Sequence, residues 1–332
     1  MSNINLKHTC KKTGYNLPSL SAIKPYLEPA GQGPSGIWAK ETARRIGCKV
    51  CVGYPEVVAE NTEDNEKEAY YNSLLVVDGN GEVLVNYRKS FLYYTDETWA
   101  LEGDVKRGFA RLPFQASMGG ENGGGGGSGN EEDTTVATTF GICMDINPYR
   151  FEAPWTAWEF ANRIIDSKSQ LVIVSMAWLT LSDREQLQAL GTKPELDTFN
   201  YWIQRLMPLF RRKMEHRPEK HHGIEDEEKR VVVVFSNRVG EEEGHDDQGQ
   251  KNDSPVRYAG SSAVLAFSQR PSSSSSPASQ IATDGPDSDS DSRNADPDVR
   301  ILCRDLMGAS EEGICFEDTA SDPRMVFSLV KT

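Results

Sequence analysis

Basic residues are scarce in this 332-residue sequence: 36 Lys and Arg stand against 50 Asp and Glu, which gives a net charge of −14. Three polar segments, 119–133, 242–253 and 269–298, carry −4 each, so the rest of the chain is nearly neutral. A surface that binds phosphate groups needs clustered Lys and Arg. We therefore expect no nucleic-acid partner, and we interpret the basic run at 211–213 as a solvated helix end.

Long apolar runs are absent as well. No stretch approaches the run of about eighteen apolar residues that a membrane-spanning helix requires. The first residues, MSNINLKHTCKKTGYN, contain no hydrophobic segment typical of a secretory signal. The sequence therefore predicts no membrane partner and a soluble protein of the cytoplasm, with the nucleus as an alternative.

Cysteines are few and scattered, six in the whole chain, which argues against a disulfide framework. Cys48 and Cys51 form a CxxC motif, but they lie in the apolar run CKVCVGY. A buried strand explains this pair better than a redox or metal site does. No cysteine pair has zinc-ligand spacing with histidines, so we expect no metal and no cofactor.

The three polar segments are rich in Gly, Ser and acidic residues and have little apolar surface to bury. They are predicted to be disordered surface insertions. A chain of this length is expected to form one large domain or two small ones. We predict a single domain over residues 1–332, interrupted by the three insertions.

Between the insertions, short β-rich runs alternate with stretches whose apolar residues recur at steps of three and four. Gly79-Asn80-Gly81 indicates a hairpin turn. Continuous apolar runs such as VVVVF at 231–235 indicate strands buried on both faces, hence an α/β fold with layered sheets and helices. Strands are expected at 49–56, 73–89, 138–146, 169–178, 230–240 and 260–267, and helices at 34–47, 151–167 and 197–214.

Cys143 is the first candidate for chemistry. It lies in TTFGICMDINPYRFEAPW, where an apolar strand gives way to a turn and then to a predicted helix. A side chain at such a junction is accessible, and a following helix N-terminus favours a thiolate. The alternative is a small buried side chain, which is the commoner role of a single cysteine.

Lys89 and Glu97 are the second element, in NYRKSFLYYTDE. A lysine that ends a buried strand is costly unless it meets a carboxylate or stabilises negative charge, for example on the oxygen of an attacked amide. The alternative is a surface lysine just beyond the strand.

Together these motifs resemble the nitrilase, or carbon–nitrogen hydrolase, superfamily. The resemblance implies an αββα sandwich in which Cys143 is the nucleophile, Lys89 the catalytic lysine and Glu97 a second glutamate that orients the lysine. Further stretches agree in order: VGYPE at 52–56, SMAW at 175–178, SNRVGEE at 236–242 and AGSSAVL at 259–265.

Within the superfamily, TGYNLPSLSAIKPYLEP, YRKSFLYYTDETW and GICMDINPYRFEAPW are similar to amidohydrolases of the N-degron pathway. The resemblance implies that the partners are protein or peptide N-termini bearing Asn or Gln, which are deamidated to Asp or Glu through a cysteine thioester. Two alternatives stay open: a hydrolase of other small amides, nitriles or carbamoyl compounds, and a catalytically impaired protein that binds peptide N-termini. Homo-oligomers are an open prediction too.

One expected acid has no counterpart. The family's catalytic glutamate belongs to a Pro-Glu shortly before the TGYN motif, whereas TGYN at 13–16 is preceded here by LKHTCKK. We therefore expect the opening strand, helix and strand to be absent and the activity to be reduced. Glu56 and Glu97 are the substitutes to consider as general base.

Binding of a free α-amine requires a carboxylate near the pocket mouth. Asp96, Asp145 and Glu152 are candidates by proximity in sequence, although Asp145 fits a capping role at least as well. Trp178 is expected to form a wall of the substrate pocket, with Trp99 and Trp155 as further candidates. Core packing is the alternative for each tryptophan.

Overall fold

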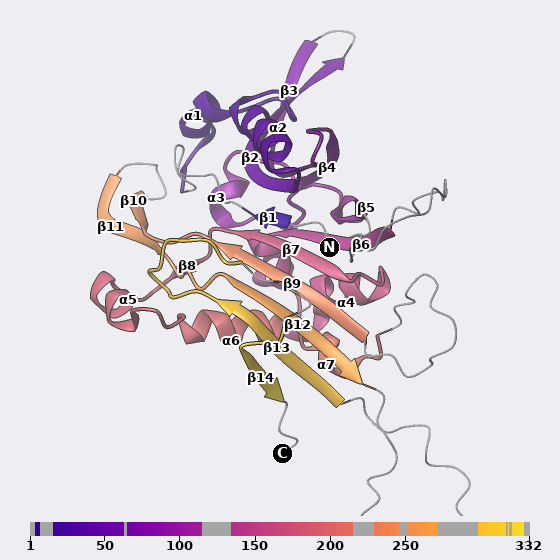
Figure 1. Ribbon diagram of the computed structural model, residues 1–332. Coiled ribbons are helices and arrows are strands. Elements are labelled where there is room, and N and C mark those ends of the chain that lie inside the picture. Colours follow the sequence, from indigo (N-terminus) through magenta and orange to yellow (C-terminus); the bar gives the residue numbers. More distant parts are fainter. Residues whose placement is uncertain are drawn as a thin grey trace, which may run out of the picture.

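Two large β-sheets form the centre of the protein (Figure 1). The computed structural model describes residues 4–6, 16–62, 65–114, 134–214, 229–245, 251–270, 298–316, 318 and 321–328. The first sheet has the order β1-β2-β3-β4 and the second the order β14-β13-β12-β9-β7-β6-β5. Their strands are β1 Ile4–Leu6, β2 Lys49–Thr62, β3 Asn65–Val77 and β4 Val83–Arg88, and β5 Phe109–Phe114, β6 Thr134–Ile142, β7 Leu171–Met176, β9 Lys229–Asn237, β12 Ala263–Arg270, β13 Asp298–Leu306 and β14 Met325–Ser328.

A third, small sheet and seven α-helices complete the described structure. The small sheet has the order β10-β11-β8 and begins directly after Trp178. Its strands are β8 Leu179–Thr180, β10 Glu241–His245 and β11 Lys251–Tyr258. The helices are α1 Leu20–Ile23, α2 Pro34–Ile46, α3 Tyr94–Glu97, α4 Glu159–Asp166, α5 Arg184–Leu190, α6 Leu196–Arg205 and α7 Pro208–Arg211, with 3₁₀ turns η1 Lys24–Tyr26, η2 Val105–Gly108, η3 Cys143–Ile146, η4 Tyr149–Phe151 and η5 Trp155–Ala157.

The alternation of side chains along β2 explains the layering on one side. Val50 and Val52 face α2 and pack with Ala39 and Ala43. Cys51, between the two valines, points the opposite way into the core shared with the seven-stranded sheet. Successive side chains of a strand point to opposite faces, so one strand serves both layers.

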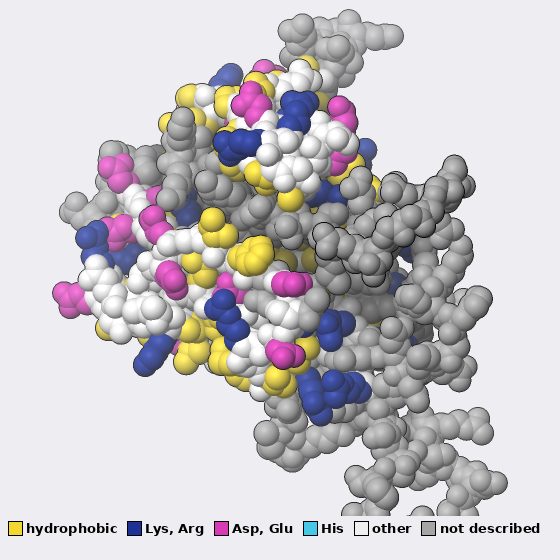
Figure 2. All heavy atoms as spheres, viewed as in Figure 1, with side chains coloured by type: hydrophobic (Ala, Val, Ile, Leu, Met, Phe, Trp, Pro, Cys, Tyr) yellow, Lys and Arg dark blue, Asp and Glu magenta, His cyan; other side chains and the backbone are white. Residues whose placement is uncertain are grey.

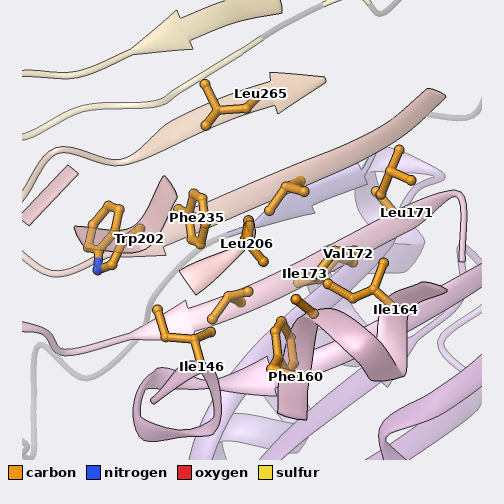
Figure 3. Packing of buried hydrophobic residues seen from close by; sticks show 14 of the residues in the cluster. Ile146, Phe160, Ile164, Leu171, Val172, Ile173, Trp202, Leu206, Phe235 and Leu265 are labelled. Atoms are coloured by element: carbon orange, nitrogen blue, oxygen red, sulfur yellow. The ribbon is translucent and has the colours of Figure 1, made fainter. Parts of the chain in front are cut away.

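The main core lies between the seven-stranded sheet and its neighbours (Figure 3). Every residue of β7 is buried, as expected for a strand covered on both faces. Phe160 from α4 and Trp202 from α6 pack against this sheet, and Trp202 stacks on Phe235 with ring centroids 5.0 Å apart. The result is a helix–sheet–sheet–helix arrangement, which confirms the predicted α/β sandwich.

One difference concerns the opening of the fold. Residues Ile4–Leu6 form the short strand β1, which pairs in parallel with β2, although no strand was expected there. An edge strand offers unpaired N–H and C=O groups, and any short extended segment can satisfy them.

Two predicted helices are interrupted. The first was expected at 151–167, but the helix α4 begins at Glu159, because Phe151 and Trp158 adopt left-handed backbone conformations (φ 57° and 42°) that end helical hydrogen bonding. The second was expected at 197–214 and divides into α6 and α7. Pro208 lacks the N–H that a continuous helix would need.

The hairpin is confirmed, and the interpretation of the CxxC motif as part of a buried strand is correct for Cys51 but not for Cys48, which precedes β2 and is half-buried. β3 and β4 are antiparallel around the turn, and Gly81 has the positive φ of 80° that this turn requires. Cys51 is buried in β2, where burial raises the pKa of its thiol to about 12, and both Cys48 and Cys51 are free.

The boundaries of the predicted insertions need correction. Residues 242–245 lie in β10 and residues 251–253 in β11, because the two segments pair as antiparallel strands. The predicted disorder at 119–133, and the parts of the other two insertions at 246–250 and 271–297, lie outside the described residues.

The described helices include none that is both long and apolar enough to cross a membrane. In the described part of the chain, no group of three or more His, Cys, Asp or Glu side chains comes together in a way that could hold a metal ion. Charged side chains of both signs are mixed over the described part of the face in Figure 2.

Candidate active site

Cys143 lies at the end of β6, where the chain turns out of the sheet. β6 ends at Ile142, and Cys143 begins the four-residue turn η3 with a φ of 44°, a left-handed conformation that is rare for a residue with a side chain. Such strain is retained where a side chain has to be aimed in a particular direction. The residue is 8% exposed and lines a pocket.

Asp145 holds this turn together. Its carboxylate accepts hydrogen bonds from the backbone N–H of Ile142 (2.7 Å), Ser90 (3.1 Å) and Phe91 (2.9 Å) and from the hydroxyl of Tyr87 (2.8 Å). It is fully buried and does not line the pocket. The interpretation of Asp145 as a reader of the substrate amine is therefore wrong, and its capping role is correct: it ties the cysteine turn to the segment that follows the lysine.

Lys89 is paired with Asp96, not with Glu97. The Lys89 ammonium donates to Asp96 Oδ2 at 2.5 Å, and both side chains are buried. Asp96 also accepts from Asn72 Nδ2 and from the backbone N–H of Tyr93, at 3.0 Å each. Glu97, one residue on, is exposed.

Asp96, and not its neighbour Glu97, pairs with Lys89 because of the geometry of α3, which is a single helical turn. Successive helical residues point about 100° apart, so only one of two adjacent carboxylates can face the core. The predicted roles of Glu97 as the orienting carboxylate and of Asp96 as the reader of the amine are both corrected: Asp96 orients Lys89.

The charge state of the Lys89 side chain follows from its surroundings. Burial lowers the pKa of Lys89, but the negative charge of Asp96, with Cys143 and Asp145 behind it, outweighs burial and raises the pKa above its usual value. Lys89 is therefore a fixed positive charge at neutral pH.

The thiol of Cys143 behaves differently from the prediction. Burial raises its pKa to about 11, although the positive charge of Lys89 and a hydrogen bond from the backbone of Ala177 lower it. The four-residue η3 turn is too short to provide the dipole of a full helix. The expected stabilisation of a thiolate by a helix N-terminus is therefore wrong.

Alkylation of Cys143 should accordingly be slow at pH 7 and accelerate with pH. A thiol whose pKa is about 11 is ionised in about one molecule in 10⁴ at pH 7, and this fraction grows about tenfold per pH unit up to the pKa. We expect the rate of iodoacetamide modification, followed at the Cys143 peptide by mass spectrometry, to increase in that way from pH 7 to 10.

Lys89→Met should slow the modification at each pH, because it removes the charge that favours the thiolate. A rate that levels off below pH 8 would instead indicate an acidic thiol, as the sequence alone suggests.

The pocket above Cys143 is small. Its volume is about 190 Å³, below the range of roughly 300–1,000 Å³ typical of sites for drug-sized ligands. It therefore suits a single side chain. Trp178 forms part of its wall, as predicted, and packs against Tyr201 and Trp202. The lining residues are Tyr93, Cys143, Met144, Asn147, Phe151, Ala177, Trp178 and Leu179.

No carboxylate is among the lining residues in the described part of the chain. Glu56, weighed as a general base, is buried in a bidentate pair with Arg88 at 2.8 and 3.0 Å and accepts from the Ser73 hydroxyl at 2.6 Å. Burial acts to raise its pKa, but these donors outweigh burial and lower it. Glu56 is a structural anion and a weak base.

Several site residues carry no signal in the sequence. Asn147 accepts from the Tyr201 hydroxyl at 2.5 Å, and Ala177 contributes only its backbone. Phe151, whose backbone is left-handed, also lines the pocket. Trp155 packs against Tyr201 outside the pocket lining, and Trp99 and Glu152 do not line the pocket either.

Comparison with known proteins gives a consistent set of relatives, although no family model matches the chain. The chain is 34% identical over 178 residues to the protein N-terminal amidase of Saccharomyces cerevisiae; the match covers 53% of this chain and 37% of that protein. It is 28% identical over 270 residues to the protein N-terminal amidase of Schizosaccharomyces pombe, covering 77% and 76% of the two chains. The first match therefore spans little more than a third of the relative's length.

Solved structures agree on the fold. An N-terminal amidase crystallised with an Asn-Glu-Ala peptide has a TM-score of 0.58 and 23% identity, and the match covers 79% of this chain and 80% of that one. The same kind of enzyme with a Gln-Val peptide has a TM-score of 0.57. At this identity the likeness establishes the fold.

Proposed function

We propose that this chain, which resembles the nitrilase, or carbon–nitrogen hydrolase, superfamily in its motifs, is a thiol amidohydrolase that converts N-terminal Asn and Gln of proteins and peptides to Asp and Glu. The observation that carries the proposal is the position of Cys143 in the lining of a pocket sized for one side chain, within electrostatic reach of the buried Lys89–Asp96 pair. The names of the relatives and the peptides bound to the similar amidases support this choice of substrate.

The first step is the attack of Cys143 on the side-chain amide. The thiol gives its proton to solvent, and the sulfur forms a bond to the amide carbon while one C=O electron pair moves to oxygen. Lys89 is held charged by Asp96, so it favours the thiolate before the attack and the tetrahedral oxyanion after it.

The second step expels ammonia. The oxyanion re-forms the C=O bond, the C–N bond breaks as the nitrogen takes up a proton from water, and a thioester to Cys143 remains while ammonia leaves. Water then attacks the thioester carbon, the C–S bond breaks, and Asp or Glu leaves with its new carboxylate. No oxidant or cofactor takes part in this sequence.

The rate of the first step depends on how the thiol is ionised. A positioned general base is typically worth about 10²–10⁴ in rate, and the described lining of the pocket contains no carboxylate. We therefore expect slow turnover at pH 7 that increases with pH, in parallel with the thiolate fraction of Cys143.

The test is ammonia release from Asn-Gly-Ala and Gln-Gly-Ala, with their N-acetylated forms and free asparagine as comparisons. The proposal predicts release from the unblocked peptides, and the Cys143→Ala variant should release none. Hydroxylamine should trap the thioester as a hydroxamate. Release from small amides but not from peptides would favour another hydrolase of the superfamily, and peptide binding without ammonia would favour a binding protein.

Two further sequence-based predictions stand as proposals: action in the cytoplasm or nucleus, and self-association. Edge strand β14 exposes Met325, Val326 and Phe327, which supports pairing between copies through a sheet edge. Imaging of a tagged chain and sedimentation analysis test the two proposals.

A further inference from the structure

The pocket mouth continues outward as a cluster of aromatic side chains that the reaction chemistry does not use. Tyr93 and Phe151 line the pocket, and Tyr94 lies beyond them. The ring centroids are 5.1 Å apart for Tyr93 and Tyr94, 5.8 Å for Tyr94 and Phe151, and 6.5 Å for Tyr93 and Phe151. We call these three residues the aromatic rim.

The rim is unusually exposed for side chains of this kind. Tyr94 is 61% exposed and Phe151 is 45% exposed. Exposed large apolar side chains are common singly, but a contiguous group beside a pocket indicates a binding surface. Phe151 also has a φ of 57°, a strained conformation for a residue with a large side chain.

The position of the aromatic rim is fixed relative to Cys143 and the Lys89–Asp96 pair. Tyr94 begins α3, the turn that carries Asp96, and Tyr93 donates its backbone N–H to the Asp96 carboxylate at 3.0 Å. Phe151 follows Cys143 by eight residues through the η3 and η4 turns. The two tyrosines are therefore anchored to the turn that carries Asp96, and Phe151 is anchored to the turns that follow Cys143. A ligand bound on the rim keeps a defined position relative to Cys143.

When the first side chain of a peptide occupies the pocket, the rest of the peptide extends out of the pocket over the aromatic rim. The pocket, about 190 Å³, has room for one side chain, so the second residue lies at the mouth. Aromatic and aliphatic side chains pack well on exposed rings, whereas glycine offers nothing to pack.

From this geometry we propose that the aromatic rim selects substrates by the residue that follows Asn or Gln, and that it favours large apolar side chains there. The inference rests on the proposed function. The rim adds binding that is equal in the ground state and the transition state, so the preference appears in KM and not in kcat.

The experiment compares Asn-Phe-Ala with Asn-Gly-Ala. We expect kcat/KM to be about tenfold higher for Asn-Phe-Ala in the unmodified chain, a size typical of one aromatic contact and its area. Tyr94→Ala should reduce this ratio to about two, whereas Tyr94→Phe, which keeps the ring, should preserve it. Tyr26→Ala, which removes a 39% exposed tyrosine on η1, serves as the matched control and should leave the ratio unchanged.

Dissociation constants of the same two peptides, measured with Cys143→Ala, separate the inference from the proposed function. Discrimination that Tyr94→Ala reduces in binding supports the rim even where no peptide is hydrolysed. The inference is overturned if the ratio is near one in the unmodified chain, or if both Tyr94→Ala and Phe151→Ala retain it. It is equally overturned if neither peptide binds.

Discussion

Asp96→Asn should reduce kcat by about 10²–10³, the cost of losing one group that stabilises the oxyanion. Lys89 is fully buried, and Asp96 is its partner at 2.5 Å. Without the negative charge of Asp96, burial lowers the pKa of Lys89 and disfavours its charged form. Removal of one member of a buried pair is expected to lower the free energy of unfolding by about 3–5 kcal/mol. Ammonia release and urea denaturation measure the two effects.

Glu97→Gln is the matched control, since it makes the same chemical change one residue further along the chain. Glu97 is exposed, so the change should alter kcat less than twofold and leave the urea midpoint in place. Equal losses in the two variants, or a larger loss in Glu97→Gln, would restore Glu97 as the partner of Lys89. The urea measurement decides between the residues independently of catalytic rate.

Asp145→Asn should be comparably damaging to stability, by about 2–6 kcal/mol, because the substitution leaves two buried donors without an acceptor and each costs about 1–3 kcal/mol. The carboxylate serves three backbone N–H groups and the Tyr87 hydroxyl. An asparagine has only one acceptor oxygen, and its NH₂ group would face donors. We expect a lower urea midpoint with an unchanged denaturant slope, and a loss of activity because the turn at Cys143 is no longer held.

Asp104→Asn provides the comparison for this variant. Asp104 is exposed and accepts from the backbone N–H of Lys106 at 2.9 Å at the start of η2. Asparagine caps as well as aspartate, so the change should cost less than about 0.5 kcal/mol. A similar, small cost for Asp145→Asn would show that its buried network contributes little.

The elements that the sequence predicted well are those determined by local pattern. The strand at VVVVF, the helix over 34–46 and the Asn-Gly hairpin follow from apolar periodicity and from turn chemistry, which act within a few residues. The resemblance to the superfamily rests on short motifs of the same kind. It singled out Cys143 and Lys89 as candidate catalytic residues, and the structure brings the two within electrostatic reach of each other.

The features that the sequence predicted poorly depend on contacts between residues far apart in the chain. The first part of the helix expected over 151–167 is replaced by turns, in which Phe151 and Trp158 have left-handed backbone conformations. The local sequence pattern does not predict these conformations. The choice of Asp96 over Glu97 is of the same kind. Both residues follow Lys89 at a plausible spacing, and the orientation of a single helical turn, held by Asn72 from β3, decides which carboxylate is buried.

The sequence by itself therefore determined the class of fold and gave Cys143 and Lys89 as candidates for the nucleophile and the catalytic lysine, because periodicity and motif spacing depend only on the order of the residues. Only the tertiary structure decided the partner of the lysine, the capping role of Asp145, the high pKa of the thiol and the aromatic rim. These depend on burial and on distances between segments far apart in the chain. Burial sets the cost of a charge, and distance sets which group compensates it.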